Sequence, residues 1–243
     1  MLPDGRALQR RELLMEALQL NIEAFQADRR SSALCVAVGR SLNGDETFAV
    51  GGRKWSAREL LFRAIDMDPS NAAAYVGLSD LLGPDDTIVM EDGRCLNKHT
   101  LLGEAILRDV RCSEAYVRVG NGMVPQSYPL PVPNGTGGKR VMSRRELYLE
   151  AIICDPHNSA AFLLLSRTLR DGEQIAVPGG SSSMDRTDLL REAIRLDSNN
   201  GGAYIALAED TLSRGLQSVT LPPDGCVWTV EELFQEAHRI ENA

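Results

Sequence analysis

The sequence has no long hydrophobic run and few aromatic residues, which make up 5% of its 243 positions. Its longest purely apolar stretches, residues 33–38 and 160–165, hold six residues each, far fewer than the roughly 20 needed to cross a bilayer. The first residues also lack the basic and apolar regions of a secretory signal. With 43% hydrophobic and 25% charged residues, the composition is typical of a globular protein. These features predict an intracellular, cytoplasmic protein with no membrane-inserted segment.

Positive charge and paired cysteines are scarce as well. Lys and Arg number 26 against 34 Asp and Glu, which gives a formal net charge of −8. Nucleic-acid-binding domains show the opposite balance, so the composition argues against a nucleic-acid partner. The five cysteines contain no Cys-x-x-Cys pair, and an odd number makes a poor disulfide framework. We expect reduced and mostly buried thiols.

Residue patterns for catalysis or cofactor binding are also missing. The three histidines lie far apart in the sequence, and no two histidines or cysteines have the spacing of metal ligands. Residues 135–140 superficially resemble a phosphate-binding loop, but Pro133 and Arg140 stand where that motif needs Gly and Ser or Thr. No nucleophile with a nearby base is found. The sequence therefore predicts no catalytic residue, no metal site, no cofactor and no enzymatic activity.

A repeat organises the whole chain. Alanines recur at intervals of 40, 41, 46, 42 and 44 residues, at Ala24, Ala64, Ala105, Ala151, Ala193 and Ala237. Four residues after each of the first five stands an aspartate, and eleven residues after each stands a bulky or apolar side chain such as Tyr75 or Phe162. Such a period is the signature of a repeat architecture. We predict a single repeat domain over residues 1–243, with about five units that are partial at both ends.

Each unit begins with a helix that carries a capping signal. The predicted caps are Ser56, Asn97, Ser143, Asp185 and Thr229. An acidic residue three positions later predicts a capping box in every unit except the second, where Thr100 departs from the pattern. The recurrent aspartates follow this helix, where each is expected to accept a local backbone amide rather than act as an acid. Near the N-terminus an extended helix is predicted from Gln9 to Ala27.

A second helix and a hairpin complete the unit. The second helix follows turns such as Asp68-Pro69-Ser70-Asn71, in which Asn71, Asn158 and Asn200 are the predicted caps. Alternating residues around Asp92-Gly93 predict a hairpin over residues 87–96, outside the helical core. The counterparts turn at Gly51-Gly52, Asn134-Gly135, Gly179-Gly180 and Asp224-Gly225.

The turn and second helix of this unit resemble the tetratricopeptide (TPR) repeat family. The resemblance rests on residues 68–78, with Ala64 and Pro69 at the family's small-residue and helix-breaking positions. It covers nearly the whole chain, but units of 40 to 46 residues exceed the family's 34, which leaves a HEAT-type helical repeat as a rival assignment. The resemblance implies a mostly α fold, a right-handed α-solenoid of helix pairs, here with short β-hairpin insertions between the helices.

The resemblance also implies a concave groove that binds a protein or peptide partner. The residues expected on that surface are Arg40, Asp80, Arg118, Asn121, Arg167 and Glu209. The family's Lys, Asn and Arg clamp for acidic C-termini is not matched at its positions. We predict an interaction scaffold. The alternative is a structural segment that self-assembles through its repeat ends or hairpin edges.

Overall fold

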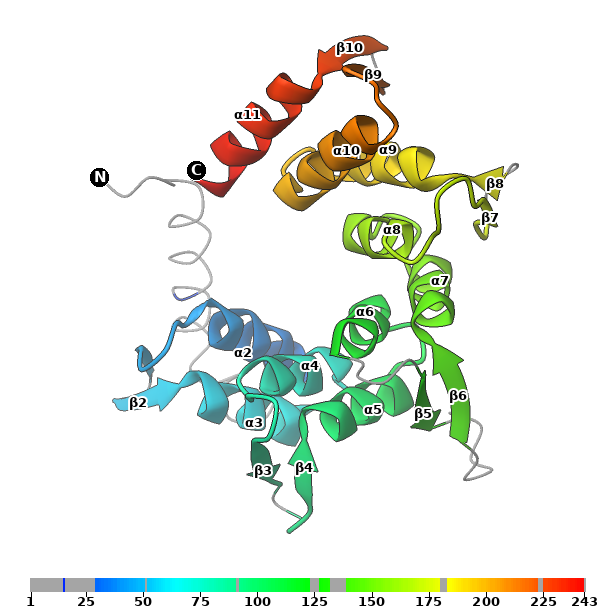
Figure 1. The fold of residues 1–243 in the computed structure, drawn as a ribbon. Coiled ribbons are helices and arrows are strands. Elements are labelled where there is room, and N and C mark those ends of the chain that lie inside the picture. Colours follow the sequence, from blue (N-terminus) through cyan, green and yellow to red (C-terminus); the bar gives the residue numbers. More distant parts are fainter. Residues whose placement is uncertain are drawn as a thin grey trace. The chain divides into compact units, whose positions relative to one another are not determined.

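The computed structural model describes residues 15, 29–50, 52–90, 92–122, 127–131, 139–179, 183–222 and 225–242. Within these residues the chain forms ten helices and five two-stranded antiparallel hairpins (Figure 1). The predicted mostly helical fold with short hairpin insertions is therefore confirmed for the described residues. The predicted extended helix Gln9–Ala27, apart from residue 15, and the turn at Asn134-Gly135 lie outside them.

Helices of two kinds alternate along the chain. The A helices are α2 (Arg29–Ser41), α4 (Ala72–Asp80), α6 (Ser113–Gly122), α8 (Ser159–Ser166) and α10 (Gly201–Ser213). The B helices are α3 (Ala57–Met67), α5 (Lys98–Arg108), α7 (Arg144–Cys154), α9 (Arg186–Leu196) and α11 (Val230–Glu241). Each A helix is joined to the following B helix through a hairpin, and each B helix to the next A helix through a short turn.

The five hairpins are short and antiparallel. They consist of β1 (Thr47–Val50) with β2 (Arg53–Ser56), β3 (Thr87–Val89) with β4 (Cys95–Asn97), β5 (Ser127–Pro131) with β6 (Lys139–Ser143), β7 (Ile175–Ala176) with β8 (Ser183–Met184), and β9 (Ser218–Leu221) with β10 (Cys226–Thr229). At the turn before β4, Gly93 has a φ of 80°, a conformation that glycine adopts without the steric cost of a Cβ.

Two compact parts make up the chain. Residues 1–115 and 130–140 form the N-terminal part, and residues 116–129 and 141–243 form the C-terminal part. In the N-terminal part α2 packs on α3, α3 on α4 and α4 on α5. In the C-terminal part the same succession runs from α7 through α8, α9 and α10 to α11. Each of these helices therefore packs mainly on its neighbours in sequence.

The B helices start as the sequence predicts. All five predicted caps accept a hydrogen bond from the backbone of the third helical residue, and each helix has a complete capping box. The expectation that Thr100 breaks the pattern is wrong, because its Oγ1 accepts from the Asn97 amide at 2.8 Å. A threonine hydroxyl thus serves in place of the usual carboxylate.

The turns between B and A helices are held by side chains. Asn158 and Asn200 cap their helices as predicted, whereas Asn71 makes no side-chain capping bond. The Asn71 Nδ2 donates instead to Ser32 Oγ at 2.7 Å, and that hydroxyl donates to the Ala64 carbonyl at 2.8 Å. These hydrogen bonds link the turn before α4 to the start of α2 and to the end of α3.

The C-terminal part contains the same arrangement. Asn200 Nδ2 donates to Ser159 Oγ at 2.7 Å, and Ser159 Oγ donates to the Ala193 carbonyl at 2.8 Å. Both serine hydroxyls donate to the carbonyl of a repeat alanine. The buried polar groups at these joints are thereby satisfied, as close packing of successive helices requires.

The structural role predicted for the aspartates is confirmed where they are described. Each Oδ1 accepts a hydrogen bond from the amide two residues later, at 2.9 to 3.1 Å, for Asp68, Asp109, Asp155 and Asp197. Asp28 lies outside the described residues. These carboxylates hold the tight turns after the B helices.

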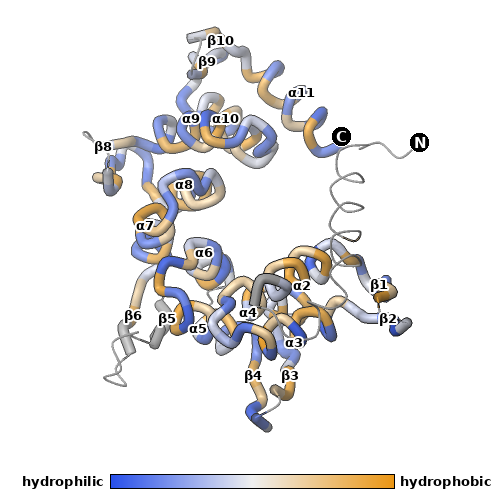
Figure 2. Tube along the Cα trace, turned by 180° about the vertical axis from the view of Figure 1, so that it is seen from behind, coloured by the Kyte–Doolittle hydropathy of each residue, from blue (hydrophilic) through white to orange (hydrophobic). Residues whose placement is uncertain are grey.

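The hairpin over residues 87–96 lies partly inside the core, contrary to the prediction. Ile88, Met90 and Leu96 are buried, whereas Val89 and Cys95 between them are exposed. In Figure 2 the strands β3 and β4 are mostly hydrophobic in colour, and the tip that joins them is hydrophilic. The alternation thus places one face of this hairpin against the helices and the other toward solvent.

The prediction of mostly buried cysteines is also wrong. Cys35 is buried, Cys112 and Cys154 are partly buried, and Cys95 and Cys226 are exposed. All five lie in the described part of the chain and form no disulfide there. In the same part, no helix has both the length and the apolar character needed to cross a membrane.

Candidate functional site

Five of the six predicted surface residues occupy one position of the repeat. Arg40, Asp80, Asn121, Arg167 and Glu209 each stand five residues after the bulky repeat residue of their A helix. We call these five the row residues. All lie at or near the carboxyl ends of A helices, so one structural position carries different polar groups in successive units.

The first two row residues meet in the N-terminal part. Arg40 Nη1 donates to Glu114 Oε2 at 2.9 Å, and its Nη2 lies 3.8 Å from Asp80 Oδ2. The hydrogen bond with Glu114 raises the pKa of Arg40 above its ordinary value. This arginine is therefore held by two carboxylates of its own chain. Glu114, 74 residues away in sequence, was not among the predicted residues because it does not occupy the row position.

Two other row residues, Asn121 and Arg167, line one pocket of the C-terminal part. The pocket has a volume of about 570 Å³ and lies among the carboxyl end of α6, the start of α7 and the end of α8. We call it the arginine pocket. It is lined by Asn121, Ser143, Arg144, Arg145, Tyr148, Leu164, Arg167 and Thr168. Three arginines and no carboxylate are in this set.

Tyr148 gives the arginine pocket a rigid wall. Its side chain is only 2% exposed, and its phenol donates to Asn121 Oδ1 at 3.2 Å. The ring packs so closely on α6 that a Cβ added at Gly120 would lie 2.5 Å from Tyr148 Cε1. Burial raises the pKa of Tyr148, while Arg144 and Arg167 act in the opposite direction. The phenol is therefore neutral at pH 7 and serves as a hydrogen-bond donor.

Arg145 is anchored at the edge of the pocket. Its Nη1 contacts Glu173 Oε1 at 2.6 Å, and its Nη2 donates to the Thr168 carbonyl at 2.7 Å. The hydrogen bond from Arg145 lowers the pKa of Glu173 to about 2. These bonds tie the start of α7 to the segment after α8. Arg144 and Arg145 were not predicted as site residues. The sequence did contain a signal for them, because the helix dipole favours acidic side chains at a helix start and two arginines there are unusual.

Arg167 also borders a second hollow, which contains the next row residue. This hollow, of about 340 Å³, is lined by Ser166, Arg167, Arg186, Leu190, Ala206, Glu209, Asp210 and Ser213. Asp210 is buried within it and accepts from Thr187 Oγ1 at 2.6 Å. It also contacts Arg214 Nε at 3.1 Å. Charges of both signs are thus balanced in this hollow, unlike in the arginine pocket.

The sixth predicted residue, Arg118, lies elsewhere. It is partly buried on α6, one turn before Asn121, and is not among the residues that line the two hollows. Of the six predicted residues, the structure thus brings Arg40 near Asp80, and Arg167 beside both Asn121 and Glu209.

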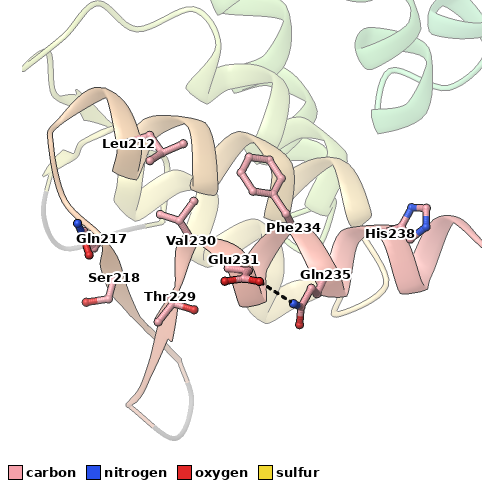
Figure 3. A pocket seen from close by; sticks show the side chains of 9 residues that line it. All are labelled: Leu212, Gln217, Ser218, Thr229, Val230, Glu231, Phe234, Gln235 and His238. Carbon is pink, nitrogen blue, oxygen red and sulfur yellow. Dashed lines mark hydrogen bonds between the residues drawn. The ribbon is translucent and has the colours of Figure 1, made fainter.

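A further hollow of about 980 Å³ lies beside α11. Leu212 of α10 and Val230, Phe234 and His238 of α11 line it, together with residues of the last hairpin (Figure 3). The Phe234 side chain is 38% exposed, and Leu212 is also exposed. Gln235 Nε2 donates to Glu231 Oε1 at 3.3 Å along the helix, as the dashed line in Figure 3 shows. This surface is apolar in contrast to the arginine pocket.

Among the residues that the structure describes, no group of three or more His, Cys, Asp or Glu side chains is placed to hold a metal ion. The polar side chains that line the arginine pocket are instead three arginines, an amide, a phenol and two hydroxyls, and Arg145 among them is paired with Glu173. A comparison of the sequence with protein-family models finds no match, and no curated protein matches it significantly.

Proposed function

We propose that this chain is a non-enzymatic protein-interaction scaffold of TPR-like units. In this proposal the helix pairs continue as a right-handed α-solenoid, and a peptide or protein partner binds the concave surface along the carboxyl ends of the A helices. The regular alternation of A and B helices supports it, because repeats of this kind stack on their neighbours and present extended surfaces.

The observation that carries the proposal is the continuity of the row residues in the C-terminal part. Asn121 and Arg167 line the arginine pocket, and Arg167 and Glu209 line the adjacent hollow. Polar groups from three successive A helices are thus connected through one arginine. A ligand that contacts several repeats in turn would be an extended segment of chain, and Arg is enriched at protein interfaces.

Selection of peptides from a displayed random library tests the proposal. The full-length chain should enrich peptides whose binding is lost in the Arg167→Glu variant, because that change reverses the charge shared by both hollows. Arg111→Glu, in an exposed turn before α6, serves as the control and should retain binding. Enrichment of no peptide, or equal binding by both variants, would exclude the row residues as the binding surface.

A second candidate function, structural self-assembly, is favoured by the surface of α11. Phe234 is 38% exposed, whereas Leu61, Leu102 and Leu190 at the same repeat position are fully buried. The exposed face of α11 could therefore be covered by another copy of the chain. Sedimentation across a concentration series tests this candidate, since a monomer at every concentration would exclude it.

A further inference from the structure

One surface of α11 has an acidic end, an apolar centre and a basic end. Glu231, Phe234 and His238 all line the hollow beside this helix (Figure 3), and we call this lining the α11 surface. Glu231 belongs to the acidic first turn and His238 to the basic last turn. They are seven residues apart, which is about two helical turns, and Phe234 lies between them. Such a surface is complementary to a copy of itself that runs in the opposite direction.

The centre of the α11 surface is apolar. Phe234 is 38% exposed and Leu212 of α10 is 53% exposed, and the partly buried Val230 lines the hollow with them. In α3 the residue at the position of Phe234 is Leu61, which is fully buried. A Cβ added at Gly77 of α4 would lie 2.7 Å from Leu61 Cδ2. The position of Phe234 is therefore one that a packed helix covers elsewhere in this fold.

The polar ends of the α11 surface have hydrogen-bonding capacity left. Glu231 Oε1 accepts from Gln235 Nε2 at 3.3 Å, and a carboxylate can accept further hydrogen bonds at both oxygens. The Asn242 Nδ2 lies 3.2 Å from His238 Nδ1 and 3.3 Å from its Nε2. A neutral imidazole offers this amide one acceptor nitrogen, and its other nitrogen carries a hydrogen that can be donated. Both end groups can therefore bond to a second molecule.

We propose that the α11 surface binds the α11 surface of a second copy of the chain, with the two helices antiparallel. This inference rests on the second candidate function and specifies the contact that it uses. A twofold axis near Phe234 brings the two rings together and sets Glu231 of each copy opposite His238 of the other. The two helix dipoles also run in opposite directions.

The distribution of charge selects this arrangement. A parallel pair of α11 helices would place Glu231 opposite Glu231 and His238 opposite His238, whereas the antiparallel pair places an acid opposite a base at both ends. The contact uses the same surface on each copy, so it closes at two copies and predicts a dimer rather than a filament. Aromatic side chains at the centre of an interface contribute most of its binding energy, so Phe234 should supply affinity and the two end groups orientation.

Sedimentation equilibrium of the full-length chain tests the proposal. The wild type should form a dimer with a measurable dissociation constant. His238→Glu should raise that constant at least tenfold, because it places two glutamates opposite each other at both ends of the contact. The double variant Glu231→Lys/His238→Glu should return the constant to within threefold of the wild-type value, because each lysine then faces a glutamate. In a parallel pair lysine would face lysine, and the double variant would not restore the dimer.

Arg239→Gln is the matched control. It lowers the charge of the last turn by one, as His238→Glu does for a neutral histidine, but Arg239 does not line the hollow. Its dissociation constant should stay within twofold of the wild-type value. The double variant also controls for folding, since both of its changes oppose the helix dipole. A restored dimer therefore cannot result from a more stable helix.

The outcomes separate this inference from the function on which it rests. A wild type that stays monomeric at every concentration would overturn both the inference and self-assembly, and would leave the α11 surface to a partner other than this chain. Self-assembly would stand, and the antiparallel contact would fail, if the double variant did not restore the dimer. Equal weakening by His238→Glu and Arg239→Gln, or assembly beyond a dimer, would have the same meaning.

Discussion

Cys35 shows how strongly the repeat core changes the chemistry of a single side chain. It takes the position filled by Tyr75, Tyr116 and Tyr204 in other units, and it is completely buried. Burial raises the pKa of its thiol to about 11 from a model-compound value of 9.0. Because the thiolate is the reactive species, a shift of this size reduces the reactive fraction at pH 8 by about a hundredfold.

We therefore expect selective alkylation of the native protein. Iodoacetamide at pH 8 should modify the exposed Cys95 and Cys226 quickly and leave Cys35 unmodified, as read by mass spectrometry of tryptic peptides. Denaturation in urea should make the three cysteines equally reactive. Rapid modification of Cys35 in the native state would show that the core around α2 opens readily.

Gly120 is a second residue whose environment can be tested. Alanine there would favour the helix by roughly 1 kcal/mol, but its Cβ would lie 2.5 Å from Tyr148 Cε1. The buried ring is hydrogen-bonded to Asn121 and cannot move aside without a cost of about 1–3 kcal/mol. Gly120→Ala should therefore lower the free energy of unfolding by about 1 kcal/mol in urea denaturation.

The control for Gly120 is a double-mutant cycle. Combined with Tyr148→Leu, which introduces the residue found at the same repeat position in three other units, Gly120→Ala should become neutral or stabilising. An equal loss in both backgrounds would mean that the ring is not what restricts position 120.

At the scale of elements, the capping boxes make the most direct prediction. Asn97 Oδ1 accepts from the Thr100 amide at 2.9 Å, and Thr100 Oγ1 accepts from the Asn97 amide. Asn97→Ala should lower the free energy of unfolding by about 1 kcal/mol, within the range for N-cap residues. Thr100→Val, which keeps the shape but removes the acceptor, should cost about 0.5 kcal/mol.

Lys98→Ala is the matched control for this cap, since it changes the neighbouring helical residue without touching the box. Its effect on unfolding in urea should stay within ~0.5 kcal/mol, as is usual for surface substitutions. If Thr100→Val proves as neutral as Lys98→Ala, the hydroxyl does not contribute as the reciprocal acceptor.

The helices and hairpins could be predicted because their determinants are local. Each capping residue bonds a partner three positions away, and the hairpin around Gly93 depends on a few adjacent residues. Thr100 was misjudged because the sequence rule names Glu or Gln, whereas the physical requirement is only an acceptor within reach. The buried face of this hairpin was missed because alternation alone does not say what covers a strand.

The candidate site was predictable only in part. The repeat position identifies Asn121 and Arg167 as equivalent, but it does not reveal that Tyr148 and Arg144 complete the same pocket. Those contacts depend on how α6, α7 and α8 pack, and they join residues 20 or more positions apart. The pairing of Arg40 with Glu114 was missed for the same reason, because no periodic pattern encodes a contact across 74 residues.

At the scale of the whole molecule, equivalent residues of the repeat differ in what covers them. Leu190 on α9 is fully buried, whereas Phe234 at the same position of α11 is 38% exposed. In a repeat protein the stability is roughly a sum of unit terms and nearest-neighbour interface terms. The same truncation should therefore have very different effects at the two positions.

Leu190→Ala should lower the free energy of unfolding by about 2–5 kcal/mol, as is usual for a buried leucine. Phe234→Ala should cost about 1 kcal/mol or less in dilute protein, although it removes a larger side chain, because part of that side chain is already in water. Urea denaturation followed by circular dichroism measures both. Comparable losses in dilute solution would show that Phe234 is covered within the monomer.

Repeating the measurement at high protein concentration separates the two candidate functions. If copies of the chain cover the face of α11, association stabilises the folded state by mass action. The wild-type midpoint should then rise with concentration, while the Phe234→Ala midpoint should rise less. A scaffold that stays monomeric should instead show concentration-independent midpoints for both proteins, and its partner would have to be found at the row residues rather than at α11.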